Sequence, residues 1–388
     1  MDKSMIGWQQ GSSAELELFS PGSGGGANVF QFKYTPQFRT TIRPPITELQ
    51  LGPANLDSLK DALNRLGAAR RGRGVAAPPP SAPQPDALIE AKRIGQMLFE
   101  LVIPPDVQAD LRTENLYLEI GADEGLLEYP WEMLHDGDDF LSLKNYVGRF
   151  VNVTKRSSTL QQQRREKWAD DVLQVLLITV PRPQPRHATS YEALLRAEDE
   201  TKTVIDTLLP LGPCVKVTLL KDADATPSKV FDALRTARYH IVHFNGHAFF
   251  SDEPYKSSLV LWNEDMSTGI LRAFFARNPP VFFFMNACET AATKSGGSEW
   301  KSSYEIFGLA RGFLETGAYL LGTRWKIDDL GALAFAKTFY SKLLEGKPLG
   351  MAIRDARVAC KAATSPDDLS WASYLFYGDP RLYFRKLI

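Results

Sequence analysis

Two residues with reactive side chains each follow an apolar stretch in the second half of the sequence. His247 comes after "YHIVHFNG" (239–246), and Cys288 comes after "VFFFMNA" (281–287). A cysteine thiolate is a nucleophile, and an adjacent imidazole accepts the thiol proton or stabilises the thiolate. The pair therefore indicates covalent catalysis, with the backbone N–H groups of Gly246 and Cys288 as donors to the oxyanion of a tetrahedral intermediate.

Each of these residues alone also fits a structural role. A single cysteine after a buried strand usually packs as a small apolar side chain, and a single histidine there usually makes structural hydrogen bonds. We expect such a packing or hydrogen-bonding role for His240 and His243, which lie earlier on the same stretch. Only the combination of His247 and Cys288, each at the end of a strand, favours a catalytic dyad.

The elements that must position this pair alternate along the second half of the chain. Apolar segments of strand length are predicted at 172–180, 214–220, 239–245, 258–262, 281–287 and 317–324. Helices are predicted between them at 190–210, 227–237, 303–317, 329–346 and 348–363. This alternation predicts an α/β fold, with a mostly parallel sheet covered by helices on both faces. In such sheets the reactive residues gather at the carboxyl ends of the strands.

The first half has a different composition. Segments 14–20 and 28–35 alternate as in a β-hairpin, 55–66 and 86–103 have helical periodicity, and 115–120 has the pattern of a strand. Between them, 66–86 is rich in proline, alanine and arginine and has little to bury, which predicts a flexible linker. We therefore expect a hairpin and helix region (1–65), the linker (66–86), an N-terminal half (87–165) and a main domain (166–388).

Composition excludes several classes of protein. The 388 residues carry a net charge of −1, which gives no electrostatic footprint for nucleic acid or an anionic membrane. The three cysteines are scattered without a CxxC pair, and the histidines lack the spacing of a zinc triplet, so we expect no metal and no disulfide framework. No phosphate-binding loop, no long apolar run and no signal peptide is recognisable. We expect a cytoplasmic protein without cofactors.

Several segments, in order along residues 90–388, resemble the CHAT family of caspase-like cysteine peptidases, which belong to clan CD and are distantly related to separase. They are "YPWEMLHDGDDF" (129–140), "HIVHFNGHA" (240–248), "FFFMNACET" (282–290), "GAYLLGTRWKIDD" (317–329) and "WASYLFYGDPRL" (371–382). The resemblance implies a caspase-like domain preceded by a pseudo-caspase-like N-terminal half with a small β-hairpin region. It also implies His247 and Cys288 as catalytic residues. The family often has glycine after the histidine, where this chain has Ala248.

The resemblance also implies a substrate preference. "GTRWKIDD" (322–329) is similar to the separase block in which an acidic residue four positions after tryptophan meets a basic P1 side chain, and that position is Asp329. We expect Asp328 and Asp329 to form this S1 site, although either residue could instead cap the helix that begins there. Further acidic candidates are Asp252, Glu253 and Glu289. With a basic P1, the linker arginines become sites of autocleavage: Arg70, Arg71 and Arg73.

Three kinds of function fit these observations. The first is a peptidase that takes a protein substrate, and the others are a catalytically silent adaptor and an α/β ligand-binding module. The resemblance favours the peptidase, acting in regulated bacterial proteolysis such as antiphage defence or programmed cell death. Its partners would be an effector encoded nearby, such as a pore-forming protein, and an upstream sensor protein. Trp131 and Glu132 of the first block are expected to be structural, at the place where the two halves meet.

Overall fold

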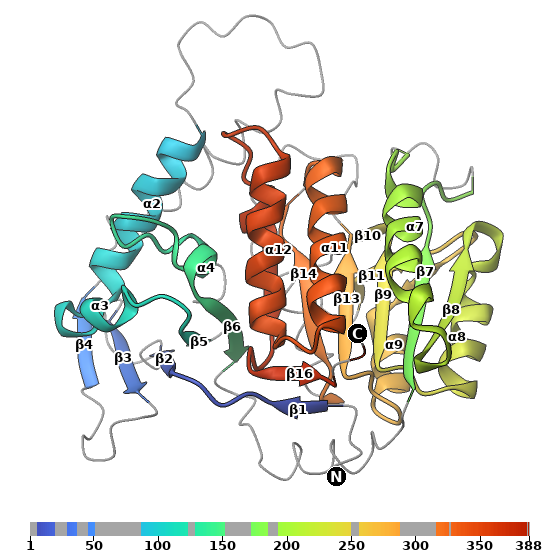
Figure 1. Cartoon of the computed structure of the whole chain (residues 1–388), viewed down its shortest axis with the longest axis horizontal. Coiled ribbons are helices and arrows are strands. Elements are labelled where there is room, and N and C mark those ends of the chain that lie inside the picture. The colour runs from blue at the N-terminus through green and yellow to red at the C-terminus, as the bar shows by residue number, and fades with distance from the viewer. Residues whose placement is uncertain are drawn as a thin grey trace, which may run out of the picture.

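The computed structural model describes residues 6–19, 29–36, 46–50, 87–122, 129–151, 172–184, 193–249, 256–287, 316–325, 327–385 and 387. Over these residues one mixed sheet of 11 strands runs through the molecule (Figure 1). In spatial order its strands are β4 (Ile46–Gln50), β3 (Val29–Pro36), β2 (Ser13–Phe19), β5 (Tyr117–Ala122), β6 (Tyr146–Val151), β15 (Tyr374–Tyr377), β14 (Tyr319–Thr323), β13 (Phe282–Asn286), β9 (Ile241–Asn245), β7 (Leu173–Thr179) and β8 (Val215–Lys221).

The sheet contains two sets of parallel strands that meet at β15. Strands β8, β7, β9, β13 and β14 are parallel to one another, and β15 is antiparallel to β14. On the other side β15 is parallel to β6, and β6, β5 and β2 are parallel in turn, with β3 and β4 added as antiparallel strands. Strands β9 and β13 are buried along their whole length, as expected for central parallel strands covered on both faces.

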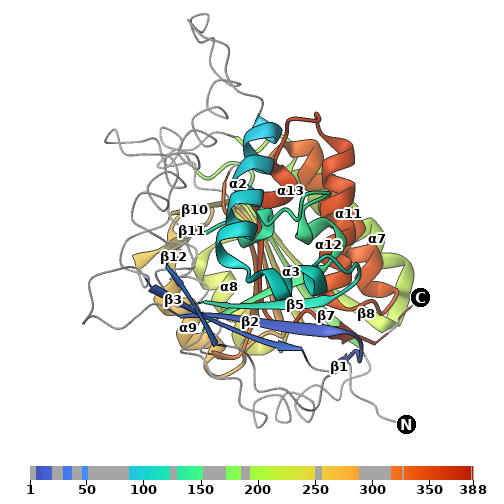
Figure 2. The ribbon, with the colours of Figure 1, turned by 90° about the vertical axis from the view of Figure 1, so that its left-hand side faces the viewer.

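Helices cover both faces of the C-terminal set. Helices α7 (Ala197–Leu208), α11 (Asp329–Leu344) and α12 (Leu349–Ala363) lie side by side on one face, and α8 (Pro227–Thr236) and α9 (Thr268–Phe275) lie on the other (Figures 1 and 2). Helix α11 places Phe335 and Phe339 on one stripe, and both rings contact the ring of Phe284 on β13. This aromatic packing fixes the helix against the strand that precedes Cys288.

The N-terminal set has helices of its own. Helix α2 (Ala87–Val102) buries Ala91, Ile94 and Leu98 at helical spacing, and α3 (Pro105–Leu111) follows it. Two smaller sheets complete the described structure. They are the pair β1 (Ile6–Trp8) and β16 (Leu382–Phe384), and the antiparallel sheet of β10 (His247–Phe249), β11 (Ser258–Val260) and β12 (Asp265–Ser267).

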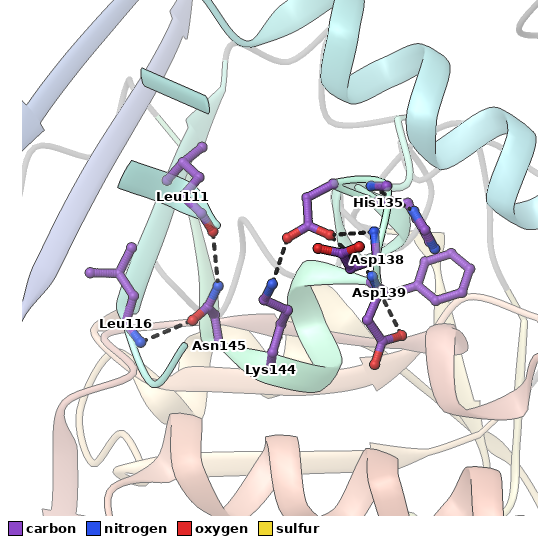
Figure 3. A network of polar contacts seen from close by, with 10 residues as sticks. Leu111, Leu116, His135, Asp138, Asp139, Lys144 and Asn145 are labelled. Carbon is purple, nitrogen blue, oxygen red and sulfur yellow. Dashed lines mark hydrogen bonds and ion pairs between the residues drawn. The ribbon is translucent and has the colours of Figure 1, made fainter. Parts of the chain in front are cut away.

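A polar network orders the segment after the Pro-Trp-Glu block (Figure 3). The Asp136 carboxylate accepts hydrogen bonds from the backbone N–H groups of Asp138 and Asp139 and forms an ion pair with Lys144. Next to it, the Asn145 side chain accepts from the Leu116 N–H at 3.0 Å and so ties this segment to the start of β5. The short helix α4 (Leu141–Lys144) and the start of strand β6 are thereby fixed to the start of strand β5.

A buried ion pair lies next to the place where the two sets of strands meet. Arg149 on β6 donates from Nε to Glu132 Oε1 at 2.8 Å and from Nη2 to Glu132 Oε2. Arg149 is also the residue that pairs with Tyr377 of β15, and its guanidinium lies 5.9 Å from the centre of that ring. Trp131 and Glu132 are both buried, so the structural role predicted for them at the meeting point of the two halves is confirmed.

The fold class predicted from the sequence is confirmed, with local corrections. Segment 258–262, predicted as a strand of the parallel sheet, contributes β11 to the separate antiparallel sheet instead. Helix α7 begins at Ala197, later than the predicted 190, and helix α9 and strand β15 were not predicted. Segments 55–66 and 66–86 lie outside the described residues, as does 303–317 except for its last two residues. Over the described residues, no helix is both long and apolar enough to cross a membrane.

Candidate active site

The ends of β9 and β13 lie side by side in matching register. The two strands are parallel, with Asn245 opposite Asn286, and the Gly246 N–H donates to the Asn286 carbonyl at 3.4 Å. His247 and Cys288 follow this asparagine pair by two residues each. The structure thus brings together the strand ends that precede the two predicted catalytic residues. Cys288 itself lies outside the described residues, so its pairing with His247 stays a prediction.

His247 is fully buried and begins a new strand. It pairs with Val260 of β11, and Ala248 pairs with Leu259, so the chain turns from the large sheet into the small one at Gly246. A Cβ atom at Gly246 would lie 2.7 Å from the ring of Phe244, which explains why this turn takes glycine. Ala248 is not among the described non-glycine residues with positive φ, so alanine fits the position where the family often has glycine.

The predicted oxyanion-hole role of Gly246 needs a change of partner. Its N–H is already directed at the Asn286 carbonyl, although at 3.4 Å this hydrogen bond is long. To reach an oxyanion, the N–H would have to exchange this acceptor for the substrate oxygen. The role therefore stays a prediction for Gly246, as it does for Cys288.

A chain of buried polar side chains lies at these strand ends, and it was not predicted. Asn286 donates from Nδ2 to Glu200 Oε2 at 2.7 Å. The other carboxylate oxygen of Glu200 lies 3.3 Å from His243 Nε2, and His243 Nδ1 is hydrogen-bonded to the Tyr340 hydroxyl at 3.0 Å. Burial, and to a lesser degree the negative Glu200, raises the pKa of Tyr340 well above its usual value, so the hydroxyl stays protonated.

The structural roles predicted for the two earlier histidines are confirmed. His243 stacks on Phe284 with ring centroids 4.4 Å apart, in addition to its hydrogen bond to Tyr340. His240, near the opposite end of the strand, accepts a hydrogen bond from the Gln174 N–H at 3.0 Å. Burial lowers the pKa of His240 to about 4, so its imidazole is neutral near pH 7.

The segment that follows β14 is held by a short helix, α13 (Ser370–Ser373). The Ser373 hydroxyl accepts from the N–H groups of Arg324 and Trp325, both at 3.0 Å, and donates to the Trp325 carbonyl at 2.9 Å. Ser370 Oγ accepts from the Asp328 N–H at 2.7 Å. The block that resembles the separase specificity segment is thus fixed to α13 at both ends.

The two acidic residues predicted for the S1 site differ in their surroundings. Asp328 is the N-cap of α11, and its Oδ1 accepts from the N–H groups of Leu330 and Gly331 at 2.8 and 3.1 Å. Asp329 is the first residue of the helix and is exposed. The alternative of a helix cap is therefore the one that Asp328 adopts. The S1 site itself stays a prediction.

The remaining predicted site residues lie outside the described residues. They are Glu289, Asp252, Glu253 and the linker arginines Arg70, Arg71 and Arg73. In the part of the chain that is described, no group of three or more histidine, cysteine or acidic side chains could hold a metal ion.

The fold defines the class first: an α/β protein with one large mixed sheet that continues from the C-terminal strands into the N-terminal half. The family model of the CHAT domain matches residues 92–379, so the chain belongs to the CHAT domain family. No protein of curated function matches the chain.

Several solved structures are similar to the chain at low sequence identity. The Arg-specific cysteine proteinase gingipain R is 15% identical, with a TM-score of 0.47, over 86% of this chain and 76% of that chain. A structural-genomics protein from Geobacter sulfurreducens is 15% identical, with a TM-score of 0.32, over 53% of this chain and 92% of that chain. The structure titled pro-sf-caspase-1 is 10% identical, with a TM-score of 0.33, over 50% of this chain and 82% of that chain.

Proposed function

We propose that the protein is a cysteine endopeptidase in which Cys288 is the nucleophile and His247 the general acid and base. The observation that carries the proposal is the register of β9 and β13, which places Asn245 opposite Asn286 just before the two residues. A nucleophile and its base must be close in space, and adjacent parallel strands that end together provide this. Membership of the CHAT domain family supports the same assignment.

The proposed reaction has two stages. The Cys288 thiolate attacks the carbonyl carbon of the scissile peptide, and the tetrahedral oxyanion is stabilised by backbone N–H groups. His247 gives its proton to the leaving amine, so that the C–N bond breaks and a thioester remains on Cys288. Water, deprotonated by His247, then attacks the thioester, and the released thiolate regenerates the enzyme. None of these steps calls for a metal or cofactor.

We further propose that the P1 residue of the substrate is basic and that Asp329 recognises it. Asp328 and Asp329 are a matched pair for this test, because they are adjacent acidic residues and Asp328 is the N-cap of α11. Asp329→Asn is expected to weaken cleavage after arginine and lysine by at least about 10-fold, because it removes the negative charge that meets the P1 cation. Asp328→Ala is expected to lose about 1 kcal/mol of stability with the P1 preference kept. Cleavage rates on arginine and norleucine peptides, with thermal unfolding of each variant, distinguish the two roles.

A P1-randomised peptide library, incubated with the wild-type protein and with Cys288→Ala, tests the function directly. We expect cleavage after arginine or lysine by the wild-type protein and no cleavage by the variant. The same two proteins test the linker, since only the wild type should be nicked near 70–74. Equal and negligible cleavage by both proteins would instead identify a catalytically silent adaptor. Cleavage only after apolar residues would discard the S1 role of Asp329.

The substrate we propose is a protein that presents a basic residue in an accessible segment. An effector held inactive by a short peptide, such as a pore-forming protein encoded nearby, would become active on a single cut. A separate sensor protein would supply the trigger, as in regulated bacterial proteolysis during antiphage defence or programmed cell death. Incubation of the protein with products of the neighbouring genes, followed by mass spectrometry of new termini, would identify the substrate.

A further inference from the structure

The two residues that precede Cys288 are held from both neighbouring strands and from a helix. The Asn286 carbonyl accepts from the Gly246 N–H of the β9 side. The Ala287 carbonyl accepts from the Thr323 hydroxyl, at the end of β14, at 3.1 Å. The Asn286 side chain donates to Glu200 on α7 at 2.7 Å. Three hydrogen bonds from three elements therefore fix the chain directly before the proposed nucleophile.

Thr323 is placed to hold the last carbonyl before Cys288. It is 1% exposed and ends β14, the strand parallel to β13 on the side away from β9. Its hydroxyl reaches across to the Ala287 carbonyl, beyond the last paired residues of the two strands, Met285 and Gly322. The backbone hydrogen bonds between β13 and β14 end at Met285 and Gly322. Beyond that point, the Thr323 side chain supplies the next hydrogen bond between the two chain segments.

Glu200 holds the preceding residue from another direction. Glu200 lies in the first turn of α7, yet its exposed fraction is only 3%. Its side chain points toward the sheet and bonds to Asn286, whose exposed fraction is 7%. A buried carboxylate is costly unless it is hydrogen-bonded, so the Asn286 amide and the Glu200 carboxylate stabilise each other's position. His243, held by Tyr340 on α11, contacts the second oxygen of the same carboxylate.

We propose that Glu200 and Thr323 are positioning residues for the cysteine nucleophile, since their side chains fix Asn286 and Ala287 and thereby the point from which Cys288 leaves β13. This inference rests on the proposed peptidase function. Neither residue touches the reacting atoms in this role, and both act through the backbone of the two intervening residues. Misplacement of a reacting group by about 1 Å costs about 100-fold in rate, so loss of either bond should lower kcat more than it raises KM.

A matched pair of threonines tests this inference. Thr323→Val removes the hydroxyl bonded to Ala287 and keeps the shape of the side chain. Thr179→Val is the control, because Thr179 is also 1% exposed and also ends a parallel strand, but its hydroxyl bonds to Thr201 at 2.7 Å. We expect Thr323→Val to lower kcat by about 10- to 100-fold with little change in KM. Thr179→Val should keep kcat within about twofold at a similar loss of melting temperature, and Thr323→Ser should restore most of the activity.

A double-mutant cycle tests the second positioning residue. Glu200→Ala and Asn286→Ala should each lower kcat, and the double variant should be no slower than the slower single one, because Glu200 acts through Asn286. Glu200→Gln, which keeps an oxygen acceptor for the Asn286 amide, should retain more activity than Glu200→Ala. Additive losses in the double variant, or a kcat of Thr323→Val equal to that of Thr179→Val, would overturn the inference.

Alkylation by iodoacetamide separates this inference from the proposed function. The exposed Cys214 serves as the internal reference, and mass spectrometry of the digested protein gives the rate at each cysteine. We expect Cys288 to react faster than Cys214 in the wild type and in Thr179→Val, and to lose most of this advantage in Thr323→Val and Glu200→Ala. A wild-type Cys288 that does not react contradicts the peptidase and, with it, the positioning roles. A reactive Cys288 with unchanged rates in the variants contradicts the positioning roles alone.

Discussion

The His247→Ala variant is expected to cleave its peptide substrate about 10²- to 10⁴-fold more slowly than the wild-type protein, because a positioned general acid and base contributes this much to the rate. The loss should fall on kcat, since the imidazole acts on protons that move in the transition state. Steady-state kinetics on an arginine peptide, with Cys288→Ala as the inactive reference, measures the effect. A His247→Ala variant with wild-type kcat/KM would show that Cys288 does not depend on this histidine.

His240 is the matched control for that experiment. It is as buried as His247 and belongs to the same stretch, but it lies near the opposite end of β9 and accepts its hydrogen bond from the Gln174 N–H. His240→Ala leaves this N–H without its acceptor, so a loss of about 1–3 kcal/mol of stability is expected, with kcat close to that of the wild type. Thermal unfolding of both variants then separates loss of a buried imidazole from loss of catalysis.

The central part of the fold was predictable because the sequence pattern within each segment is enough to indicate a strand or a helix. Strands β9 and β13 are continuous apolar runs that end in polar residues, and α12 has clear helical periodicity. Segment 258–262 has the same apolar character, so nothing in its own sequence separates it from the central strands. Its antiparallel partners, β10 and β12, decide its place, and they are strands of only three residues each. Short strands are recognised by their pairing, which local patterns do not contain.

The contacts that hold the site together could not be predicted for a related reason. Glu200 stands in an acidic stretch of α7, "AEDETK", and although it shares the buried face with Ala197, Val204 and Leu208, a carboxylate is rarely expected at such a position. Its partner, Asn286, is 86 residues away in the sequence. Thr323 ends a strand, and the acceptor of its hydroxyl belongs to the neighbouring one. Side-chain bonds between distant segments follow from the sheet order, which becomes known only with the structure.

The pairing of the two halves through β6 and β15 is the other long-range feature, and Glu132 is its most sensitive point. Arg149 is fully buried, and both carboxylate oxygens of Glu132 accept hydrogen bonds from its guanidinium. Burial alone would lower the pKa of the Arg149 guanidinium, but Glu132 and Tyr377 outweigh this and raise it. Arg357 is buried nearby, and burial together with the positive Arg149 lowers its pKa to about 10, against the opposing effect of Glu132.

Glu132→Ala is therefore expected to destabilise the protein by about 3–5 kcal/mol, because it removes the carboxylate that pairs with the buried Arg149 guanidinium. Unfolding by urea, followed by circular dichroism, measures the loss. The exposed pair of Arg235 and Asp232, 3.5 Å apart, provides the control, and Asp232→Ala should leave the unfolding midpoint unchanged.

The double variant Glu132→Leu with Arg149→Met shows whether charge pairing or side-chain packing accounts for the stability of this junction. Removing both charged groups avoids burying the guanidinium without the Glu132 carboxylate, so the double variant should recover much of the stability that Glu132→Ala loses. If Glu132→Ala loses less than about 1 kcal/mol, the junction between β6 and β15 does not depend on the ion pair. If the double variant is as unstable as the single one, packing of the Arg149 side chain against Tyr377, rather than charge, holds the N-terminal strands to the strands that carry the site.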